Sequence, residues 1–369
     1  MKADPIATLK KKISSSQRPF RVLMAMRRHV ESFAQIPCCF VDAAVSVEIA
    51  YTHWTKSIRR SKYVERFHPL PDDAEEFARE LLDVIQSQEF DFVFYVDEPA
   101  LLAVYRSTCL SEYSRWLPFP VDSPLGQCIG DKSGFHQFME ANNLPTPKTY
   151  IVKTAAEATK RSVEMGFPLV VKETDSTSGN GVFVVEGQEE FEVILSRVDH
   201  GKPFMIQQFI EGMTVVATFL SYNGKLKGHI VVEKSIALNS GKGPSVAGRF
   251  IKNKPIQEIC KVIAQKGNLS GITGLDLMID REGTAYGIDP HFGRMTTHIH
   301  FAPYCGIHFG HLFRECLEGN LTEKLPATSE IAVVKYPECI YLIFQGGLFR
   351  LLKGFPLFSK KTAYLFKQP

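Results

Sequence analysis

The stretch that decides the fold is residues 271–300, GITGLDLMIDREGTAYGIDPHFGRMTTHIH. Two apolar runs flank the turn sequence Asp280-Arg281-Glu282-Gly283, which predicts a β-hairpin. Its strands carry Asp276 and Asp289, thirteen positions apart. Antiparallel pairing brings such positions together, and two adjacent carboxylates are costly unless a cation lies between them. Hard oxygen ligands suit Mg²⁺. On these residues alone, two aspartates that cap strand ends are the simpler interpretation.

Length and composition limit the class of protein. The 369 residues are enough for two or three packed units. A net charge of +3 is too even to indicate nucleic-acid binding. The eight cysteines contain no CxxC pair, which argues against a zinc site or a disulfide framework and indicates a reducing compartment. The N-terminal residues lack the apolar segment of a signal peptide, and no apolar run approaches the ~18 residues of a spanning helix. We therefore expect a cytoplasmic protein.

The first part of the chain has the pattern of an α/β layer. Nearly continuous apolar runs at 20–26 and 90–96 predict buried parallel strands. Between them, residues 72–85 combine an aspartate cap with apolar residues on one helical face. No GxGxxG follows the first strand, so a dinucleotide-binding fold is not supported. The unit ends near the proline-rich residues 118–124.

The middle of the chain alternates between helices and strands. Asp131 can cap a helix, and a capping box at 154–157 begins another, which Gly166 ends. Asn223-Gly224 predicts the turn of a further β-hairpin. The remaining expected elements are strands at 167–172, 182–185 and 204–209, the hairpin strands at 214–220 and 225–232, and helices at about 189–198 and 256–267.

A candidate phosphate-binding segment follows the strand at 167–172. Lys172 ends this strand directly before the polar, glycine-containing loop 173–181. A lysine beside small residues, whose N–H groups can approach a polyanion, is typical of phosphate binding. The loop is not a Walker loop, since no Gly-Lys-Ser/Thr occurs there. On these residues alone, a strand-terminal lysine and a surface turn are an equally good interpretation.

The order of these features, from about residue 20 to about residue 317, resembles the ATP-grasp superfamily of carboxylate–amine ligases. Residues 62–99 are similar to the preceding domain of the branch related to carbamoyl phosphate synthetase. Residues 167–181 resemble the family's FPxVVK strand and phosphate loop, and 206–212 resemble its adenine-binding linker strand. Residues 276–293 resemble its metal hairpin. The resemblance implies an ATP-grasp fold, an N-terminal α/β domain followed by two α+β subdomains that grip ATP.

The resemblance also implies domain boundaries. We expect an N-terminal α/β pre-ATP-grasp domain at 18–125, the ATP-grasp region at 126–320, and a C-terminal extension at 321–369. Within the ATP-grasp region, the lid subdomain is expected at about 148–210. The metal-binding and catalytic subdomain is expected at about 211–320.

Individual roles follow from the same resemblance. Lys132 and Lys172 match the two basic residues that hold the nucleotide phosphates. Gln207 stands where the family usually has an acidic residue near the adenine amine. The expected cofactor-binding residues, for ATP, are Lys132, Lys172, Ser178, Gly179, Gly181, Gln207, Gln208, Phe209, Ile210 and Thr214. The expected metal ligands, for Mg²⁺ or alternatively Mn²⁺, are Asp276, Asp289 and His291.

The chain departs from the family pattern at the ribose and at the metal. Thr214 stands where a glutamate commonly binds the ribose hydroxyls. The family's Glu-x-Asn becomes Asp289-Pro290-His291, and imidazole prefers softer metals than Mg²⁺. In an alternative register, Asp289 takes the asparagine position and Gly287 the glutamate position, which would damage the metal site. We expect the first register, because inserting residues into a tight hairpin turns side chains to the wrong face.

The implied function is that of an ATP-dependent carboxylate–amine ligase. Such an enzyme activates a small carboxylate as an acylphosphate and joins it to an amine, here expected to be an amino acid, with release of ADP and phosphate. The expected catalytic residues are Lys172, Asp289 and Arg294, with Arg294 stabilising the transferred phosphoryl group or clamping a carboxylate. A surface role for Arg294 is the alternative. Four histidines fit no metal spacing and are expected to have packing and loop roles: His298, His300, His308 and His311.

Two other functions stay open. One is a carboxylase or kinase type of ATP-grasp activity that uses another acceptor. The other is a nucleotide-binding protein with impaired catalysis and a regulatory or scaffolding role, which Thr214 and His291 favour. In each case we expect small-molecule substrates or ligands, no nucleic acid, and a homodimer as the default assembly.

The C-terminal residues 339–369 are basic and aromatic. They contain no acidic residue, and five lysines and arginines alternate with seven aromatic residues. One interpretation is a weak contact with a membrane surface, or a cover over an apolar substrate site. We favour the other, a helix and a strand packed on the body or across a dimer. Gly346-Gly347 and Pro356 prevent one long amphipathic helix.

Overall fold

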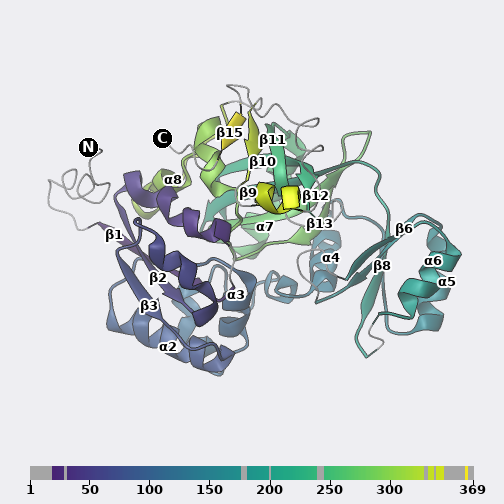
Figure 1. The fold of residues 1–369 in the computed structure, drawn as a ribbon, viewed down its shortest axis with the longest axis horizontal. Helices are drawn as coiled ribbons and strands as arrows, with labels where there is room; N and C mark the ends of the chain where they lie inside the picture. The colour runs from purple at the N-terminus through teal and green to yellow at the C-terminus, as the bar shows by residue number, and fades with distance from the viewer. Residues whose placement is uncertain are drawn as a thin grey trace.

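The computed structural model describes residues 19–28, 31–175, 181–198, 201–238, 245–327, 331–335, 338–344 and 362–364. Within these ranges the strands form a parallel four-stranded sheet, an antiparallel four-stranded sheet and a larger seven-stranded sheet. The parallel sheet and the small antiparallel sheet lie at opposite ends of the molecule, at the lower left and the right of Figure 1. The fold is therefore the predicted one, an α/β layer followed by two α+β units.

The N-terminal sheet has the strand order β3-β2-β1-β4. Its helix α2 (Ala74–Ser87) has the predicted cap, since the carboxylate of Asp73 accepts hydrogen bonds from the backbone of Glu75 and Glu76. The strands β2 and β3 are not predicted from the sequence, because a glutamate interrupts β2 and β3 is short and half-exposed. The strands are β1 (Phe20–Met26), β2 (Val45–Tyr51), β3 (Arg66–Pro69) and β4 (Phe92–Tyr95).

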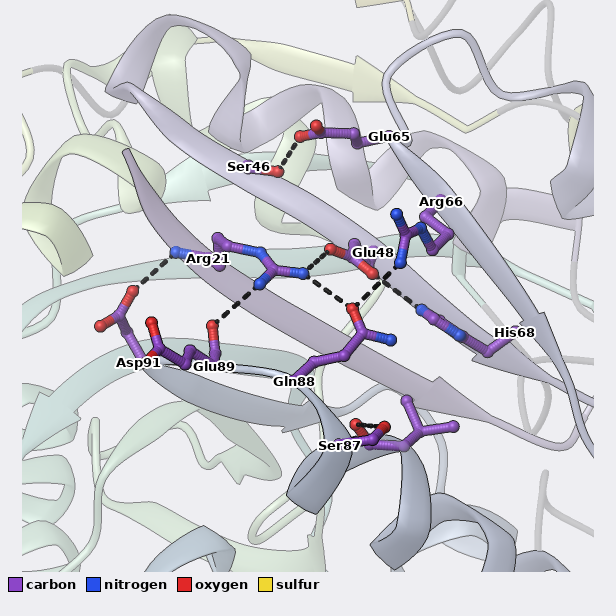
Figure 2. A network of polar contacts seen from close by, with 11 residues as sticks. Arg21, Ser46, Glu48, Glu65, Arg66, His68, Ser87, Gln88, Glu89 and Asp91 are labelled. Carbon is purple, nitrogen blue, oxygen red and sulfur yellow. Dashed lines mark hydrogen bonds and ion pairs between the residues drawn. The ribbon is translucent and has the colours of Figure 1, made fainter. Parts of the chain in front are cut away.

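The glutamate inside β2 is held by a polar network across three strands (Figure 2). Glu48 is buried and accepts hydrogen bonds from the guanidinium of Arg21 on β1 and, at 2.7 Å, from Nε2 of His68 on β3. Gln88, after α2, accepts from the same guanidinium at 2.9 Å, and Asp91 accepts from the backbone N–H of Arg21 at 2.8 Å. Burial opposes ionisation of Glu48, but His68 and Arg21 lower its pKa below the usual value. The network thus lets a charged residue occupy a buried strand.

The small antiparallel sheet, here the lid sheet, has the strand order β5-β8-β6-β7, and its strands lie within residues 148–210. The hydroxyl of Thr154 caps α5 (Ala155–Met165), and Gly166 ends it at a φ of +77°. Strand β6 begins after Pro168, which has no N–H for the ladder. The strands are β5 (Thr149–Val152), β6 (Leu169–Glu173), β7 (Val182–Val185) and β8 (Phe204–Gln208), with α6 (Gln188–Leu195) beside them.

The large sheet has the order β13-β12-β9-β10-β11-β14-β15. The turn at Asn223-Gly224 joins β9 to β10, as predicted, and both turn residues have positive φ. Strand β11 is not predicted from the sequence, because glycine and proline precede it. The strands are β9 (Met213–Tyr222), β10 (Lys225–Ala237), β11 (Ser245–Ile251), β12 (Gly271–Ile279), β13 (Ala285–Pro290), β14 (Ala332–Val334) and β15 (Thr362–Tyr364).

Helices and short 3₁₀ segments connect and cover the sheets. Helix α4, capped by Asp131, buries Phe135, Phe138 and Met139 as its pattern predicts. The α-helices not yet given are α3 (Glu98–Tyr105), α4 (Lys132–Ala141), α7 (Lys254–Gly267), α8 (Phe309–Leu317) and α9 (Glu338–Phe344). The 3₁₀ segments are η1 (Glu31–Ala43), η2 (His53–Arg60), η3 (Leu110–Trp116), η4 (Gly126–Cys128) and η6 (Ile299–Cys305).

The C-terminal residues supply a helix and a strand in their described part, which is the interpretation that we favour. Strand β15 pairs in parallel with β14 and so extends the large sheet. Residues 345–361 and 365–369, with most of the basic and aromatic side chains, lie outside the described ranges. Of the helices that are described, none has the length and apolar character needed to cross a membrane.

The hairpin β12–β13 pairs Asp276 directly with Asp289. Leu277 pairs with Gly287, so Ile288 is an extra residue in β13 and forms a bulge. The chain beyond the hairpin folds back onto β12, where the backbone N–H of His291 donates to the carbonyl of Gly274 at 3.0 Å. Gly274 leaves no room for a side chain, since a Cβ there would lie 2.4 Å from the carbonyl oxygen of Ala217 on β9 and 2.7 Å from Cγ2 of Thr296 after the hairpin.

We expect Gly274→Ala to destabilise the protein by about 1–3 kcal/mol, because the added methyl group has no space between β9 and the segment after β13. Urea unfolding followed by circular dichroism measures the loss. Gly187→Ala is the control: nothing lies within 4 Å of a Cβ at that position. Alanine at this helix cap costs less than about 1 kcal/mol. Equal stability of the two variants would contradict the packing at Gly274.

A second expectation concerns His300, which is buried and packs against Phe301 with ring centroids 4.7 Å apart. Burial, assisted by the charge of Lys335, lowers the pKa of His300 to about 3. The unfolded chain binds this proton near pH 6.5, so the contribution to stability is full above pH 6.5 and is lost as the pH falls towards 3. Between pH 7.5 and 5.5, urea unfolding should show a loss about 1 kcal/mol larger for the wild type than for His300→Phe. Identical losses of stability in the wild type and in His300→Phe would contradict the lowered pKa of His300.

Candidate active site

A cavity of about 490 Å³ lies where the lid sheet, the large sheet and the N-terminal layer meet. This volume is within the range of small-molecule sites. Most of the site residues predicted from the sequence line this cavity: Lys132, Lys172, Gln207, Gln208, Phe209, Ile210, Thr214, Asp276, Asp289, His291 and Arg294. Gly181 does not line the cavity; its carbonyl accepts from Glu173 at 2.9 Å and closes the loop. Ser178 and Gly179 lie outside the described residues.

The two predicted phosphate-binding lysines lie side by side at the lid. Lys132 begins α4, and its N–H donates to the carbonyl of Thr174 just after β6, at 3.0 Å. Lys172, on β6, is 7% exposed, and its Nζ donates to the carbonyl of Ile288 at 3.2 Å. Burial lowers the pKa of Lys172 to about 8; Asp289 opposes this and Lys132 adds to it. Both ammonium groups therefore face the metal hairpin.

The hairpin holds the candidate metal ligands together. Ligand atoms of Asp276, Asp289 and His291 all lie within 4.8 Å of one another. Nζ of Lys132 is 4.0 Å from Oδ1 of Asp289. Two carboxylates at this spacing are a donor set that suits Mg²⁺. The hairpin thus places the predicted ligands as the sequence spacing indicates, while their role as ligands stays a prediction.

The alternative register finds no support in this geometry. A Cβ at Gly287 would lie 2.6 Å from Cε of Met139 and 3.0 Å from Cζ of Phe135. These side chains belong to the apolar core beside α4, and Gly287 does not line the cavity. A larger residue at this position would therefore point away from the cavity.

His291 has both ring nitrogens engaged. Arg294 donates to Nδ1 at 2.6 Å, and since a guanidinium cannot accept, Nδ1 carries no proton. Nε2 lies 3.3 Å from Oδ1 of Asp276, which places the ring proton on Nε2. In this arrangement His291 orients Asp276 and Arg294. It can ligate a metal only after one of the two contacts is released.

Lys234, near the end of β10, is a site residue whose individual role no sequence motif predicts. Its Nζ forms an ion pair with Oδ2 of Asp276 and it lines the cavity. Burial opposes ionisation of Asp276, but Lys234 and His291 hold its pKa well below the usual range. The sequence predicts that this strand ends at residue 232, whereas β10 continues to Ala237. A prediction of the full strand would have placed Lys234 on the same sheet as the hairpin.

Apolar side chains line the cavity as well as charged ones. They include Val170 and Val184 of the lid sheet, Ile210 and Met278. Thr214 also lines the cavity, and its hydroxyl donates to Sδ of Met278 at 3.1 Å. A wall that combines apolar and charged side chains can accept a planar heterocycle together with an anionic group.

The N-terminal sheet positions Arg294. The backbone N–H of Met295 donates to the carbonyl of Tyr95 at 3.0 Å, and Arg294 bridges to Tyr95 in parallel register. Asp97, which follows β4, caps α3 and accepts from the backbone N–H groups of Arg27 and Arg28. Backbone hydrogen bonding therefore holds the segment that carries Arg294 against the end of β4.

Comparison with known proteins agrees with this geometry. Residues 129–289 match the family model described as ATP-grasp domain. A carbamoyl-phosphate synthase of Methanobrevibacter smithii is 24% identical over 185 residues, which cover 48% of this chain and 49% of that protein. A D-aspartate ligase of Enterococcus faecium is 25% identical over 197 residues, covering 47% of this chain and 46% of that protein. The chain thus spans about half the length of these curated relatives.

The fold is also similar to that of a solved structure. The crystal structure of an L-amino acid ligase from Bacillus licheniformis superposes with a TM-score of 0.62 at 20% identity, over 84% of this chain and 78% of that one. Residues 129–289 therefore form an ATP-grasp domain, and the chain as a whole has the ATP-grasp fold.

Proposed function

We propose that this protein is an ATP-dependent ligase that activates a small carboxylate as an acylphosphate and joins it to an amine. The observation that carries the proposal is the meeting, in one cavity, of Lys132 and Lys172 from the lid side with Asp276, Asp289 and Arg294. Two lysines, two carboxylates and a guanidinium are the charges needed to hold a polyphosphate, its metal and an anionic acceptor.

We expect the base and the phosphates of the nucleotide to contact different lining residues. The apolar side chains Val184 and Met278 would contact the adenine, and the backbone of Gln208 to Ile210 would offer hydrogen bonds to its edge. Lys132 and Lys172 would both contact the phosphates, as point charges. These assignments keep the nucleotide within reach of the metal hairpin.

The residues present fit a magnesium ion in part. Asp276 and Asp289 offer hard oxygen atoms on paired positions of one hairpin and would hold the metal. A bound Mg²⁺ would neutralise charge on the phosphates. His291 fits as the group that orients Asp276, because its nitrogens already contact Asp276 and Arg294.

The chemistry follows from these positions. Arg294 and Lys234 would hold the substrate carboxylate so that one of its oxygens attacks the terminal phosphorus, with cleavage of the bond to ADP. The amine nitrogen then attacks the carbonyl carbon, the C–O bond to phosphate breaks, and the amine loses a proton. Lys172, buried under the lid sheet, would stabilise the charge of the transferred group.

The names of two similar proteins support the ligase class. One is a D-aspartate ligase and the other an L-amino acid ligase. For this chain, an amino acid as one of the two substrates is therefore part of the proposal.

One observation favours a second candidate, a nucleotide-binding protein with impaired catalysis. The ammonium of Lys234 pairs with Asp276, one of the two carboxylates that a metal would need. If this pair persists with nucleotide present, the metal is held weakly and turnover is slow. Nucleotide binding without substrate-dependent ADP release distinguishes this candidate from the ligase.

The direct test measures Mg²⁺-dependent release of ADP and phosphate across a panel of amino acids paired with small carboxylic acids. We expect release that requires one particular acid–amine pair, because the acylphosphate forms only when the acceptor carboxylate is in place. A coupled assay follows both products. ATP binding with no release for any pair would instead support the second candidate.

We expect Lys172→Ala to weaken ATP binding at least about 10-fold, equivalent to about 1.4 kcal/mol, and to abolish turnover. The variant removes a buried positive charge from the proposed phosphate site. Isothermal titration with ATP measures the affinity, and circular dichroism shows whether the fold is intact. Lys160→Ala, an exposed lysine on the outer lid helix α5, is the matched control. A folded Lys172→Ala protein with wild-type affinity and activity would remove Lys172 from the phosphate site.

A further inference from the structure

A buried polar cluster lies on the cavity wall outside the matched domain. It consists of Thr297 and His298, which follow Arg294, and of Lys335 and Glu338, which follow β14. All four residues line the same cavity as the metal hairpin, yet none belongs to residues 129–289. None of the four is among the residues proposed to bind the phosphates or the metal.

Lys335 is fixed at the centre of this cluster and is 2% exposed. Its Nζ donates to Oγ1 of Thr297 at 2.8 Å and pairs with Oε1 of Glu338 at 3.0 Å. Burial lowers the pKa of Lys335 and Glu338 opposes this; the charges of Lys234 and Asp276 also act on it. The cluster is therefore within electrostatic reach of the metal hairpin.

Glu338 has one oxygen that is not accounted for. Oε1 faces Lys335, but Oε2 has no hydrogen-bond partner among the described residues, although the residue is only 6% exposed. An unpartnered buried carboxylate oxygen is costly, so a donor is expected to reach it from the cavity. Because carboxylate oxygens only accept, the candidate donors are a metal ion, an ammonium group and water.

A metal ion is the weakest of these candidates. Among the described residues, the one group of three or more side chains that could hold a metal is Asp276, Asp289 and His291. Glu338 is not in it, and its neighbour is a lysine. Water can donate to Oε2 but carries no charge. An ammonium group from a ligand matches both the charge and the hydrogen-bonding capacity of Oε2.

His298 adds a second requirement. It is 5% exposed, and both ring nitrogens have no partner among the described residues. A neutral imidazole offers one donor and one acceptor. Burial and the neighbouring charges of Lys335 and Lys234 lower the pKa of His298 well below its usual value, which keeps the ring neutral. The cluster therefore presents an acceptor for an ammonium group and a donor for an anionic oxygen.

We propose that Thr297, His298, Lys335 and Glu338 form the subsite for the amine substrate, and that this substrate is a small free amino acid. Its ammonium group would donate to Oε2 of Glu338, and its carboxylate would accept from His298 and from Lys335. A zwitterion matches one fixed cation and one fixed anion, whereas a simple amine leaves the donors of the cluster unpaired. This inference rests on the proposed ligase function, since it names the class of one of its substrates.

The test is isothermal titration of the full chain with each of the twenty common amino acids, with and without Mg²⁺ and ADP. We expect at least one amino acid to bind, and the corresponding amine without a carboxylate to bind at least about 10-fold more weakly. Glu338→Gln should weaken the amino acid at least about 10-fold while the affinity for ADP stays within about 2-fold. Gln retains an oxygen that can accept from Lys335, and the thermal midpoint checks the fold. Glu318→Gln, on a surface ion pair with Arg314, is the control.

Absence of amino-acid binding to the wild type, or equal binding by Glu338→Gln, overturns the subsite. His298→Leu is the second variant if Glu338→Gln does not fold, and it should also weaken the amino acid by at least about 5-fold. A failure of the ligase function has a different signature, because it appears as absent ADP release or absent nucleotide binding. Amino-acid affinity and ADP release are measured separately, so the two failures are distinguishable.

Discussion

The pairing of Asp276 with Asp289 across one hairpin is the constraint on which the site depends. Two carboxylates cannot stay ionised side by side unless positive charge is supplied to both. The chain supplies it from three directions: Lys234 on β10 for Asp276, and Lys132 and Lys172 at the lid for Asp289. The two carboxylates of the hairpin thus lie among three lysines, which come from the large sheet, the lid sheet and α4.

These cations also account for how the two halves of the ATP-grasp domain are held next to each other. Nζ of Lys172 donates to the carbonyl of Ile288, the bulged residue of the hairpin. Ile288 has no partner in the register of β12, and its carbonyl makes this contact with the lid sheet instead. The ion pairs of the lysines and the hydrogen bond to the bulge therefore join the hairpin and the lid sheet at one point. A polyphosphate bound there would take over from the hairpin carboxylates as the partner of these lysines.

The hairpin and the lid were predictable from sequence because their signals are local. Asp280 to Gly283 form the turn, the two aspartates are thirteen positions apart, and Lys172 stands at the end of an apolar run. Lys234, Lys335 and Glu338 carry no such signal. Each lies far along the chain from the hairpin, and only strand pairing through β9, β10, β11 and β14 brings them to the cavity. Likewise, β2 was missed because Glu48 breaks its pattern, and the partners that stabilise Glu48 come from other strands.

Residues that a local motif predicts and residues that only the sheet brings to the cavity meet different requirements. Phosphate and metal binding need a fixed spacing within short segments, so the residues that match a family model are found at 129–289. Selection among substrates needs only that some side chain reach the cavity at the right place. The segment after β14 does so with no regular motif, as Lys335 N–H bonds to Val246 at 2.8 Å and thereby carries Glu338 to the cavity wall. A site built in this way can change its substrate through the C-terminal segment while the hairpin and its cations stay the same.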